Sequence, residues 1–381
     1  MARVRVVHVI TKLALGGAQA TVLELCNGLD RDLFDLHVVC GPERDREGSL
    51  DDAFRASGAE IHFVPSMGRS VRALGDARSI GAVRRLFVRI QPDIVHTHTS
   101  KAGAVGRLAA RAAHPPATVH TVHGWSFEHG GGRFARPMIG AERLLARWSD
   151  RLVVVTEEDE TLGLRYGIGR REQYTCIRSG IQPERFAFSP SARVATRHEL
   201  GLPFDAEVIG TVGRLSEQKD PITLLRAFAH VAADRPRAQL VLVGDGPLRR
   251  EVERAVDDMR LGGRVHLVGA RHNTAAWYAA MDVFVLASRW EGLPRVALEA
   301  LASGLPVAST RTSGMREMGE RGAVLSSIGD HRALAQSITS LLERPHCLRI
   351  MPAWVDEFSV AQMVADTTAL YEQLVPTPAL V

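Results

Sequence analysis

The sequence predicts an α/β fold in which two domains, each built on a parallel sheet, face each other across a cleft. Short apolar runs alternate with amphipathic helical stretches along both halves of the chain, as they do in βαβ units. The chain has 381 residues, which is enough for two domains of ordinary size. Loops that follow the predicted strands carry glycines and charged residues, which is typical of the ligand-binding edge of such sheets. We therefore expect two Rossmann-like domains.

The first domain is predicted over residues 1–185 and the second over residues 186–358. Mostly apolar runs predict strands over residues 4–10, 36–40, 60–64, 92–97, 118–123, 151–156 and 174–180 in the first domain, and over 208–215, 239–243, 265–270, 283–286 and 305–308 in the second. Helical patterns are clearest over residues 73–90, 138–148, 295–303 and 330–342. The alternation of the two patterns predicts a parallel sheet in each domain.

Composition places the protein among globular proteins of the cytoplasm. Hydrophobic residues make up 45% of the chain and charged residues 24%. No apolar run reaches the roughly 18 residues of a membrane span. The four cysteines, at positions 26, 40, 176 and 347, show no C-x-x-C spacing, which favours reduced thiols without a structural zinc.

The positive charge is concentrated in the first half of the chain. Residues 1–185 contain 26 Lys and Arg against 21 Asp and Glu. This excess favours an anionic acceptor or a peripheral contact with the inner face of a membrane, for example through the helix that ends VRRLFVRI. A solvated domain surface explains the same charge. No nucleic-acid partner is expected.

Lysine is rare, which gives the few lysines weight as candidate ligands. Of 47 basic residues only Lys12, Lys101 and Lys219 are lysine. Each lies in a polar or glycine-containing loop next to a predicted strand. A retained lysine can mark a place that needs a compact ammonium group in place of the planar guanidinium of arginine. The same distribution can also arise by coincidence.

The stretch after the strand at 283–286 has the composition of a sugar-nucleotide site. Glu291 falls in the loop past the strand, and Glu299 falls inside the helix predicted over 295–303. Gly292 allows a ligand to approach the backbone, and Pro294 suits the first turn of the helix. Free N–H groups at about 296–298 are expected to face phosphate, while the two carboxylates bind hydroxyls. The alternative is a solvated Glu291 and an ordinary helical Glu299.

Two further loops of the second domain carry candidate phosphate ligands. The segment G-R-L-S-E-Q-K-D-P holds Arg214 and Lys219, which together could clamp a diphosphate, although either alone is explained by surface charge. The segment Gly244-Asp245-Gly246 forms half of a dinucleotide fingerprint. Arg249 stands where the third glycine of that fingerprint belongs, so the sequence disfavours a nicotinamide cofactor.

Polar residues also follow the strands of the first domain. Gly16 and Gly17 separate the first strand from a helix, which permits close approach of a phosphate or sugar but also fits a tight turn. His98 and Lys101 lie where a strand passes into a helix, and His123 is followed by the loop G-W-S-F. Fifteen histidines are present, so a single one is more often structural.

Longer strings within these loops resemble one enzyme family. E-G-L-P-R-V-A-L-E-A-L-A-S-G-L-P-V-A is similar to the E-x7-E signature of retaining glycosyltransferases of family 4, which have the GT-B fold. G-R-x4-K-D-P resembles the diphosphate motif of the same family. H-T-H-T-S-K-A-G and H-T-V-H-G-W-S-F resemble a subset that extends lipid-linked or cell-surface glycans. The resemblance covers nearly the whole chain, with Ser179-Gly180 in place of the family's Asn-Gly.

The resemblance implies roles for these residues. Glu299 would bind ribose hydroxyls and Glu291 the hydroxyls of the donor sugar. Arg214 and Lys219 would hold the diphosphate, and His123 would assist the reaction. The remaining donor contacts would come from Gly16, Gly17, Gly244, Gly269, Arg271, Gly292, Leu293, Pro294 and Val296. The acceptor side would include Lys12, His98, Lys101 and Trp125. The final helix, within residues 359–381, would return to the first domain.

The expected reaction is transfer of a hexose or N-acetylhexosamine from a UDP-sugar to a lipid-linked saccharide or glycan. Alternatives are a small-molecule or cyclitol acceptor, a sugar-nucleotide epimerase, and a nucleotide-binding scaffold without turnover. We expect no cofactor and no essential metal, because the single D-x-D, Asp30-Arg31-Asp32, lies at a turn between a helix and a strand. The sequence shows no well-placed nucleophile, which favours front-face displacement over a covalent intermediate.

Overall fold

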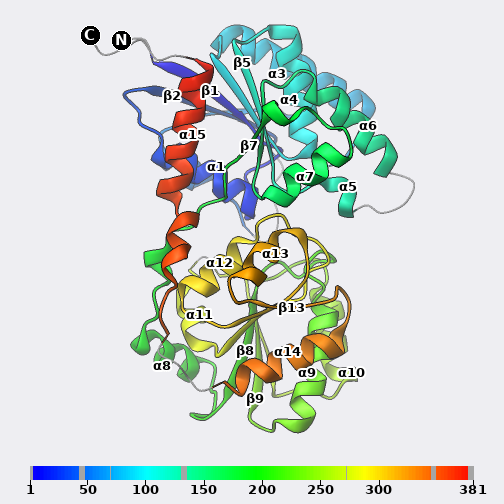
Figure 1. Ribbon diagram of the computed structural model, residues 1–381, viewed down its shortest axis with the longest axis vertical. Coiled ribbons are helices and arrows are strands. Elements are labelled where there is room, and N and C mark those ends of the chain that lie inside the picture. The colour runs from blue at the N-terminus through cyan, green and yellow to red at the C-terminus, as the bar shows by residue number, and fades with distance from the viewer. Residues whose placement is uncertain are drawn as a thin grey trace. The chain divides into compact units, whose positions relative to one another are not determined.

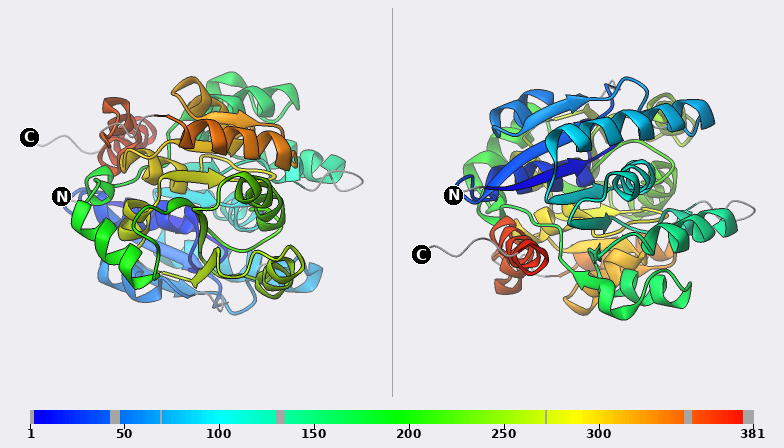
Figure 2. Two further views of the ribbon diagram at one scale, coloured as in Figure 1. Left: turned by 90° about the horizontal axis from the view of Figure 1, so that it is seen from below. Right: turned by 90° about the horizontal axis from the view of Figure 1, so that it is seen from above.

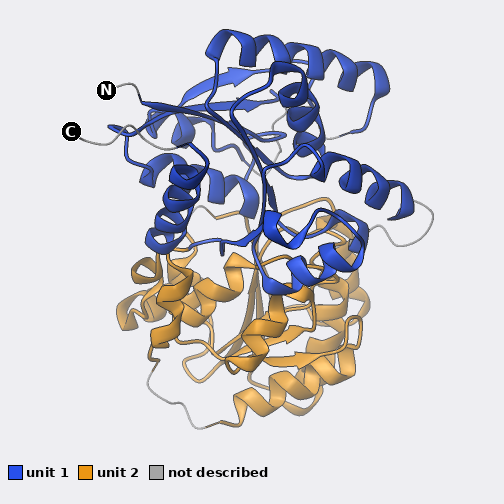
Figure 3. Cartoon of the chain, turned by 45° about the horizontal axis from the view of Figure 1, so that its top comes forward, with its two compact units in different colours: residues 1–180, 360–381 blue, residues 181–359 orange. Residues whose placement is uncertain are grey.

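The computed structural model describes residues 3–42, 48–68, 70–129, 135–271, 273–344 and 349–375. By their internal contacts the residues divide into two compact units, shown in Figure 3. The first unit contains residues 1–180 and 360–381, and the second contains residues 181–359. The division falls after Gly180, so residues 181–185, which the sequence assigns to the first domain, belong to the second unit.

The first unit is a seven-stranded parallel sheet with helices on both faces (Figures 1 and 2). The strand order is β3-β2-β1-β4-β5-β6-β7. The strands are β1 (Val4–Val9), β2 (Phe34–Cys40), β3 (Glu60–Phe63), β4 (Ile94–His98), β5 (Ala117–Val122), β6 (Arg151–Val154) and β7 (Tyr174–Cys176). The helices are α1 (Gly17–Gly28), α2 (Asp51–Ala56), α3 (Ala73–Ile90), α4 (Ser100–Ala113), α5 (Ser126–His129), α6 (Ala135–Ala146), α7 (Glu157–Arg165) and α15 (Val360–Leu374).

The second unit is a six-stranded parallel sheet in the order β10-β9-β8-β11-β12-β13. Its strands are β8 (Glu207–Val212), β9 (Ala238–Val243), β10 (Val265–Gly269), β11 (Val283–Leu286), β12 (Val307–Thr310) and β13 (Val324–Ser326). Its helices are α8 (Pro190–Glu199), α9 (Pro221–Asp234), α10 (Arg249–Asp258), α11 (Ala275–Ala280), α12 (Arg295–Ala302), α13 (Ser313–Glu320) and α14 (His331–Leu342). Two parallel-sheet units confirm the predicted Rossmann-like α/β class.

The apolar strands of the first unit are buried on both faces, which explains their poor alternation. Val6 and Ile10 pack with helix α1 and with Tyr371 of helix α15 on one face. Val7 and Val9 pack with helices α3 and α4 on the other. Helix α15 therefore completes the first unit although it comes last in the chain, and Tyr371 is fully buried.

Helix α3 begins and ends where the sequence predicts, at residues 73 and 90, whereas other boundaries differ. The strand expected over 305–308 is β12, at Val307–Thr310. The N–H groups of Gly304 and Leu305 instead donate to Leu301 O and Ala300 O, so these two residues end helix α12. Gly304 has φ +67°, the left-handed conformation that favours glycine at a helix end.

The loop predicted after His123 is short, because helix α5 already begins at Ser126. Helices α7 and α13 cover residues 157–165 and 313–320, for which we predict neither a helix nor a strand from the sequence. Cys26, Cys40 and Cys176 form no disulfide with any described residue, and Cys347 lies outside the described part of the chain. Within the described residues, no helix is both long enough and apolar enough to cross a membrane.

A buried ion pair fixes helix α4 against helix α6, and removing one partner will destabilise the first unit. Arg107 is fully buried, and its Nη2 lies 2.8 Å from Glu142 Oε2. We expect Glu142→Ala to leave this charge uncompensated and lower the free energy of unfolding by about 3–5 kcal/mol. Hydrogen exchange of the α4 amides, followed by mass spectrometry in denaturant, measures the loss.

The matched control is Glu60→Ala, which removes the same charge from a side chain that is 65% exposed. Its cost should stay below about 0.5 kcal/mol. Equal effects of the two substitutions would contradict a structural role for the Arg107–Glu142 pair.

Candidate active site

In the second unit, an ion pair joins the loops that leave two neighbouring strands. Lys219 lies in the loop after β8, and Glu291 lies in the loop after β11, which pairs with β8. Lys219 Nζ is 2.5 Å from Glu291 Oε1. Strand order reverses between these two strands, the position at which open α/β sheets bind ligands. The structure thus brings together a cation and a carboxylate that the sequence predicted as donor ligands.

Three side chains hold the Glu291 carboxylate in place. Besides Lys219, Ser288 Oγ donates a hydrogen bond to Oε1 at 2.6 Å, and Gln218 Nε2 donates to Oε2 at 3.3 Å. A carboxylate offers about four lone-pair positions. One of these positions on Oε2 has no partner among the described residues and can accept a hydrogen bond from a ligand hydroxyl.

Glu299 lies inside helix α12, as predicted. Tyr278 OH donates a hydrogen bond to Glu299 Oε2 at 2.8 Å. Burial raises the pKa of Glu299 above the ordinary value for a glutamate. Burial, followed by the neighbouring Glu299 charge, also raises the pKa of Tyr278 well above its usual value. The phenol therefore stays a donor and fixes the orientation of the carboxylate.

The start of helix α12 offers fewer free N–H groups than predicted. Ala297 N and Leu298 N both donate to Pro294 O, at 3.0 and 3.4 Å. The expectation of free groups across 296–298 is therefore wrong for these two residues, because the first turn closes on Pro294. Val296 N donates no hydrogen bond to the backbone of any described residue outside helix α12. The side chain of Leu293 is buried beside this turn.

Glycines end three adjacent strands of the second sheet. Gly213, Gly244 and Gly269 follow or end β8, β9 and β10. A Cβ on Gly244 would lie 1.9 Å from Gly213 O, and Gly244 has φ +145°. Gly244 N donates to Gly269 O at 2.9 Å. Only glycine fits at Gly244, and these three positions themselves add no side chain to the edge of the sheet.

The two candidate arginines lie at the same edge of the sheet. Arg214 directly follows Gly213, and the Lys219 side chain passes over Gly213, within 3.4 Å of a Cβ placed there. Arg271 follows β10, and its guanidinium lies 5.4 Å from the centroid of the Trp277 ring. The loops after β8 and β10 thus each present a cation.

Sequence reasoning missed several residues that shape the site. Ser313 Oγ donates to Glu291 O at 2.7 Å, and a Cβ on Gly314 would lie 1.3 Å from Gly292 O. Helix α13 therefore begins directly against the Glu291–Gly292 loop. The available signal was Thr312-Ser313-Gly314 immediately after a strand, a pattern typical of helix starts. Tyr278 and Ser288 carried no comparable signal.

In the first unit, the predicted histidines lie at the carboxyl ends of β4 and β5. His98 Nδ1 is 3.3 Å from His123 Nε2. Burial lowers the pKa of His123 to about 4 and the pKa of His98 well below its usual range. Both rings are therefore neutral at pH 7. Gly16 precedes helix α1 and Gly17 begins it, after the loop that leaves β1.

Of the remaining predicted acceptor-side residues, Lys101 forms an ion pair, whereas Lys12 and Trp125 are buried. Lys101 Nζ pairs with Asp76 Oδ1 at 2.8 Å and also contacts Ser70 O. Lys12 is buried, with 6% of its surface exposed. Trp125 is 2% exposed and donates from Nε1 to Asp159 O at 2.7 Å, so its ring lies in the core of the unit. Their acceptor-side roles stay predictions.

Comparison with known families matches the two units separately. Residues 16–180 match the model described as a glycosyl transferase 4-like domain, and residues 206–344 match glycosyl transferases group 1. The fold and the matched domains together define a glycosyltransferase.

Whole-chain relatives agree with this class. The chain is 32% identical over 316 residues to the UDP-Gal:alpha-D-GlcNAc-diphosphoundecaprenol alpha-1,3-galactosyltransferase of Escherichia coli, covering 82% of this chain and 80% of that protein. It is 30% identical over 304 residues to the putative glycosyltransferase EpsF of Bacillus subtilis, covering 79% of this chain and 78% of that protein. The chain therefore belongs to the group 1, family 4-like glycosyltransferases.

Solved structures support the fold. Anabaena HepE, crystallised with UDP and glucose, has a TM-score of 0.81 at 22% identity and covers 97% of this chain and 99% of its own. The sucrose-phosphate synthase of Thermosynechococcus elongatus also has a TM-score of 0.81 at 22% identity, covering 98% of this chain and 99% of its own.

Five histidines in or directly after β1, β4 and β5 make the stability of the first unit depend on pH. Burial lowers the pKa of His8 and His123 to about 4, and it lowers the pKa of the other three, His96, His98 and His120, well below 6.5. The unfolded chain takes up these protons near pH 6.5, whereas the folded unit does not. The unfolding free energy is therefore fully present above pH 6.5 and falls as the pH decreases towards 4.

Amide hydrogen exchange of β4 and β5, corrected for intrinsic rates, should show this loss between about pH 7 and about pH 5. His120→Gln should make the dependence less steep, since it removes one of the protons. His198→Gln, at an exposed position of the second unit, should leave it unchanged. Protection that is independent of pH over this range would contradict the neutral state of the histidines.

Proposed function

We propose that this glycosyltransferase moves a hexose or N-acetylhexosamine from a UDP-sugar to a lipid-linked saccharide or glycan, with retention of configuration and without a metal ion. The observation that carries the proposal is the Lys219–Glu291 pair at the reversal of strand order, beside Glu299 on the next helix. Lys219 supplies a cation for phosphate, and Glu291 and Glu299 supply carboxylates for hydroxyl groups.

The donor proposal rests on the site together with the relatives. The E. coli relative is named for UDP-Gal, and HepE structures contain UDP or UDP-glucose. In our proposal the Glu299 carboxylate, oriented by Tyr278, binds the ribose hydroxyls. The base lies by Gly244, Gly269 and Arg271, at the glycine-rich strand ends.

Binding of the donor would exchange the partners of the ion pair. Lys219 turns from Glu291 to the diphosphate, and Arg214 adds a second cation. Glu291, still held by Ser288 and Gln218, then accepts hydrogen bonds from the hydroxyls of the sugar. The ligand replaces each lost contact with another charged or polar contact, so neither the buried Glu291 nor the partly buried Lys219 is left unpaired.

The chemical step follows from this arrangement. The bond between the anomeric carbon and the β-phosphate oxygen breaks, and the leaving UDP gains negative charge that Arg214 and Lys219 stabilise. The acceptor oxygen bonds to the anomeric carbon on the same face, and its proton passes to the departing phosphate oxygen. These two cations supply charge that a divalent metal would otherwise provide. The family resemblance also gives His123, Gly16 and Gly17 a role at the reacting sugar.

The acceptor proposal has one supported alternative. The E. coli relative is named for a diphosphoundecaprenol-linked acceptor. The D-inositol 3-phosphate glycosyltransferase of Thermobispora bispora is also 32% identical, over 285 residues covering 65% of that protein. A cyclitol phosphate is therefore the second candidate. Assays with undecaprenyl-diphosphate-GlcNAc and with inositol 3-phosphate separate the two.

A lipid-linked acceptor is consistent with peripheral contact at the inner face of the membrane. Helix α3 exposes Leu74 by 78% and Val88 by 60%, beside the exposed Arg85 and Arg89. These side chains can combine apolar insertion with attraction to anionic lipid. Failure to sediment with phosphatidylglycerol vesicles at low salt would remove this part of the proposal.

Replacing Lys219 tests the donor site. We expect Lys219→Ala to lower kcat/KM for sugar transfer by about 10²–10³, because the leaving diphosphate loses a stabilising cation. Arg237→Ala removes an equal charge from a 63% exposed side chain of the same unit and should leave transfer within about twofold. Similar rates for the two variants would contradict the assignment of Lys219.

The stereochemistry and metal requirement can be read from one reaction. With a UDP-α-hexose donor we expect an α-linked product, identified by the anomeric proton coupling in NMR. The rate should be unchanged by EDTA. A β-linked product, or activity that returns only when Mg²⁺ or Mn²⁺ is restored, would contradict retention or metal independence respectively.

A further inference from the structure

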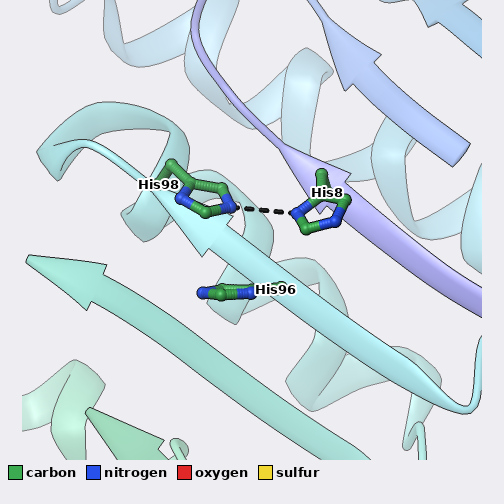
Figure 4. Close-up of side chains that lie close together, drawn as sticks. All are labelled: His8, His96 and His98. Carbon is green, nitrogen blue, oxygen red and sulfur yellow. Dashed lines mark hydrogen bonds between the residues drawn. The ribbon is translucent and has the colours of Figure 1, made fainter. Parts of the chain in front are cut away.

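Three histidines form a hydrogen-bonded row on one face of the first sheet. His8 lies in β1, His98 lies in β4, and His123 follows β5. His8 Nδ1 is 3.1 Å from His98 Nε2, and His98 Nδ1 is 3.3 Å from His123 Nε2. Figure 4 shows the first of these bonds, with His96 beside it. We call His8, His98 and His123 the histidine row.

The hydrogen bonds of the row must all run in one direction. Burial lowers the pKa of each of its members, so the three rings are neutral at pH 7. A neutral imidazole has one N–H donor and one bare acceptor nitrogen. His98 uses both of its nitrogens in the row, so it accepts from one neighbour and donates to the other. The tautomer of the ring at one end of the row therefore fixes the tautomer of the ring at the other end.

The buried end determines the direction. His8 Nε2 is buried and has no hydrogen-bond partner among the described residues. An unpaired buried N–H is costlier and rarer than an unpaired acceptor. His8 Nε2 is therefore the bare nitrogen, and the hydrogen lies on Nδ1, which donates to His98 Nε2. His98 Nδ1–H then donates to His123 Nε2.

We propose that His8 and His98 are positioning residues that hold His123 in the Nδ1–H tautomer, so that its free ring nitrogen presents a hydrogen-bond donor to the substrate. The importance of this for the reaction rests on the proposed function, in which His123 has a role at the reacting sugar. A donor at this position can bind an oxygen of the donor sugar. It cannot act as a general base, which agrees with a step in which the leaving phosphate takes the proton.

The surrounding contacts favour a hydrogen-bonded row over a metal site. Ligand atoms of His8, His96 and His98 lie within 4.8 Å of one another, the spacing of a three-histidine site. Both nitrogens of His96, however, are 2.6 Å from hydroxyl groups, those of Tyr371 and Thr121. Both nitrogens of His98 bond to the row. A metal would have to break several of these bonds in a fully buried site.

Nitrogen-15 NMR of the full-length protein, labelled in its histidines, tests the inference without an activity assay. Long-range proton–nitrogen correlations distinguish the two tautomers of a neutral ring. At about pH 7.5 we expect His8, His98 and His123 all to carry hydrogen on Nδ1. Single histidine-to-glutamine variants assign the signals. Hydrogen on Nε2 of His123 in the unmodified protein overturns the inference.

Two substitutions at one position separate positioning from packing. His98→Gln retains an N–H donor and an acceptor, whereas His98→Met retains the approximate volume but has no donor. We expect His98→Met to release His123 from the Nδ1–H tautomer and to lower kcat at least about tenfold with little change in KM. His98→Gln should restore the tautomer and bring kcat within about threefold of the unmodified protein.

Other outcomes are equally decisive. Equal kcat for the two variants overturns the positioning role. A stoichiometric metal found by elemental analysis, and lost in His8→Gln, shows that the cluster is a metal site and overturns the row. If no acceptor is glycosylated, the proposed function fails, while the tautomer of His123 is still decided by the NMR spectrum.

Discussion

Both units depend on one topological constraint, the single reversal of strand order within each parallel sheet. The reversal lies between β1 and β4 in the first unit and between β8 and β11 in the second. Loops that leave the two strands at a reversal turn to opposite sides, which opens a crevice at the carboxyl edge. Side chains that meet there come from distant parts of the sequence. Lys219 meets Glu291 in this way, and His8 meets His98.

The two reversals hold different chemistry. In the second unit the groups at the reversal are charged, and Lys219 and Glu291 form an ion pair. In the first unit they are neutral imidazoles, and Thr11 Oγ1 and Thr99 Oγ1, 3.0 Å apart, join the same two loops. The edge of the second sheet thus presents charged groups, which can bind phosphate and hydroxyl groups. The edge of the first sheet presents neutral rings, which can form directional hydrogen bonds.

The sequence predicted those features that local pattern determines. Strands buried on both faces appear as continuous apolar runs, so the strands of both sheets were predicted except β13, which is only three residues long. The loop position of Glu291 and the helical position of Glu299 followed from the flanking glycine and proline residues. Helix α13 was missed although Thr312-Ser313-Gly314 is typical of a helix start, and the contact of Gly314 with Gly292 could not be predicted from the sequence. The bond between Tyr278 and Glu299 was also missed, since no periodicity specifies the directions of two side chains.

The histidine row shows the same limit more clearly. His98 and His123 were predicted as site residues from the loops they occupy. His8 gave no signal, because it lies inside a buried strand and meets His98 across 90 residues of sequence. Trp125 shows the opposite case, since its loop suggested a ligand contact while its ring packs in the core. A motif fixes the place of a residue in the chain but not the direction of its side chain.

Binding of UDP to the second unit tests the central claim most directly. A ligand at about 100 times its dissociation constant adds about 2.7 kcal/mol to the stability of the unit that binds it. UDP should raise the unfolding temperature of the second unit, equally with and without EDTA, and the shift should be lost in Glu299→Ala. No shift with UDP, GDP, ADP or dTDP, or an undiminished shift in that variant, would contradict a nucleotide site at this edge of the sheet.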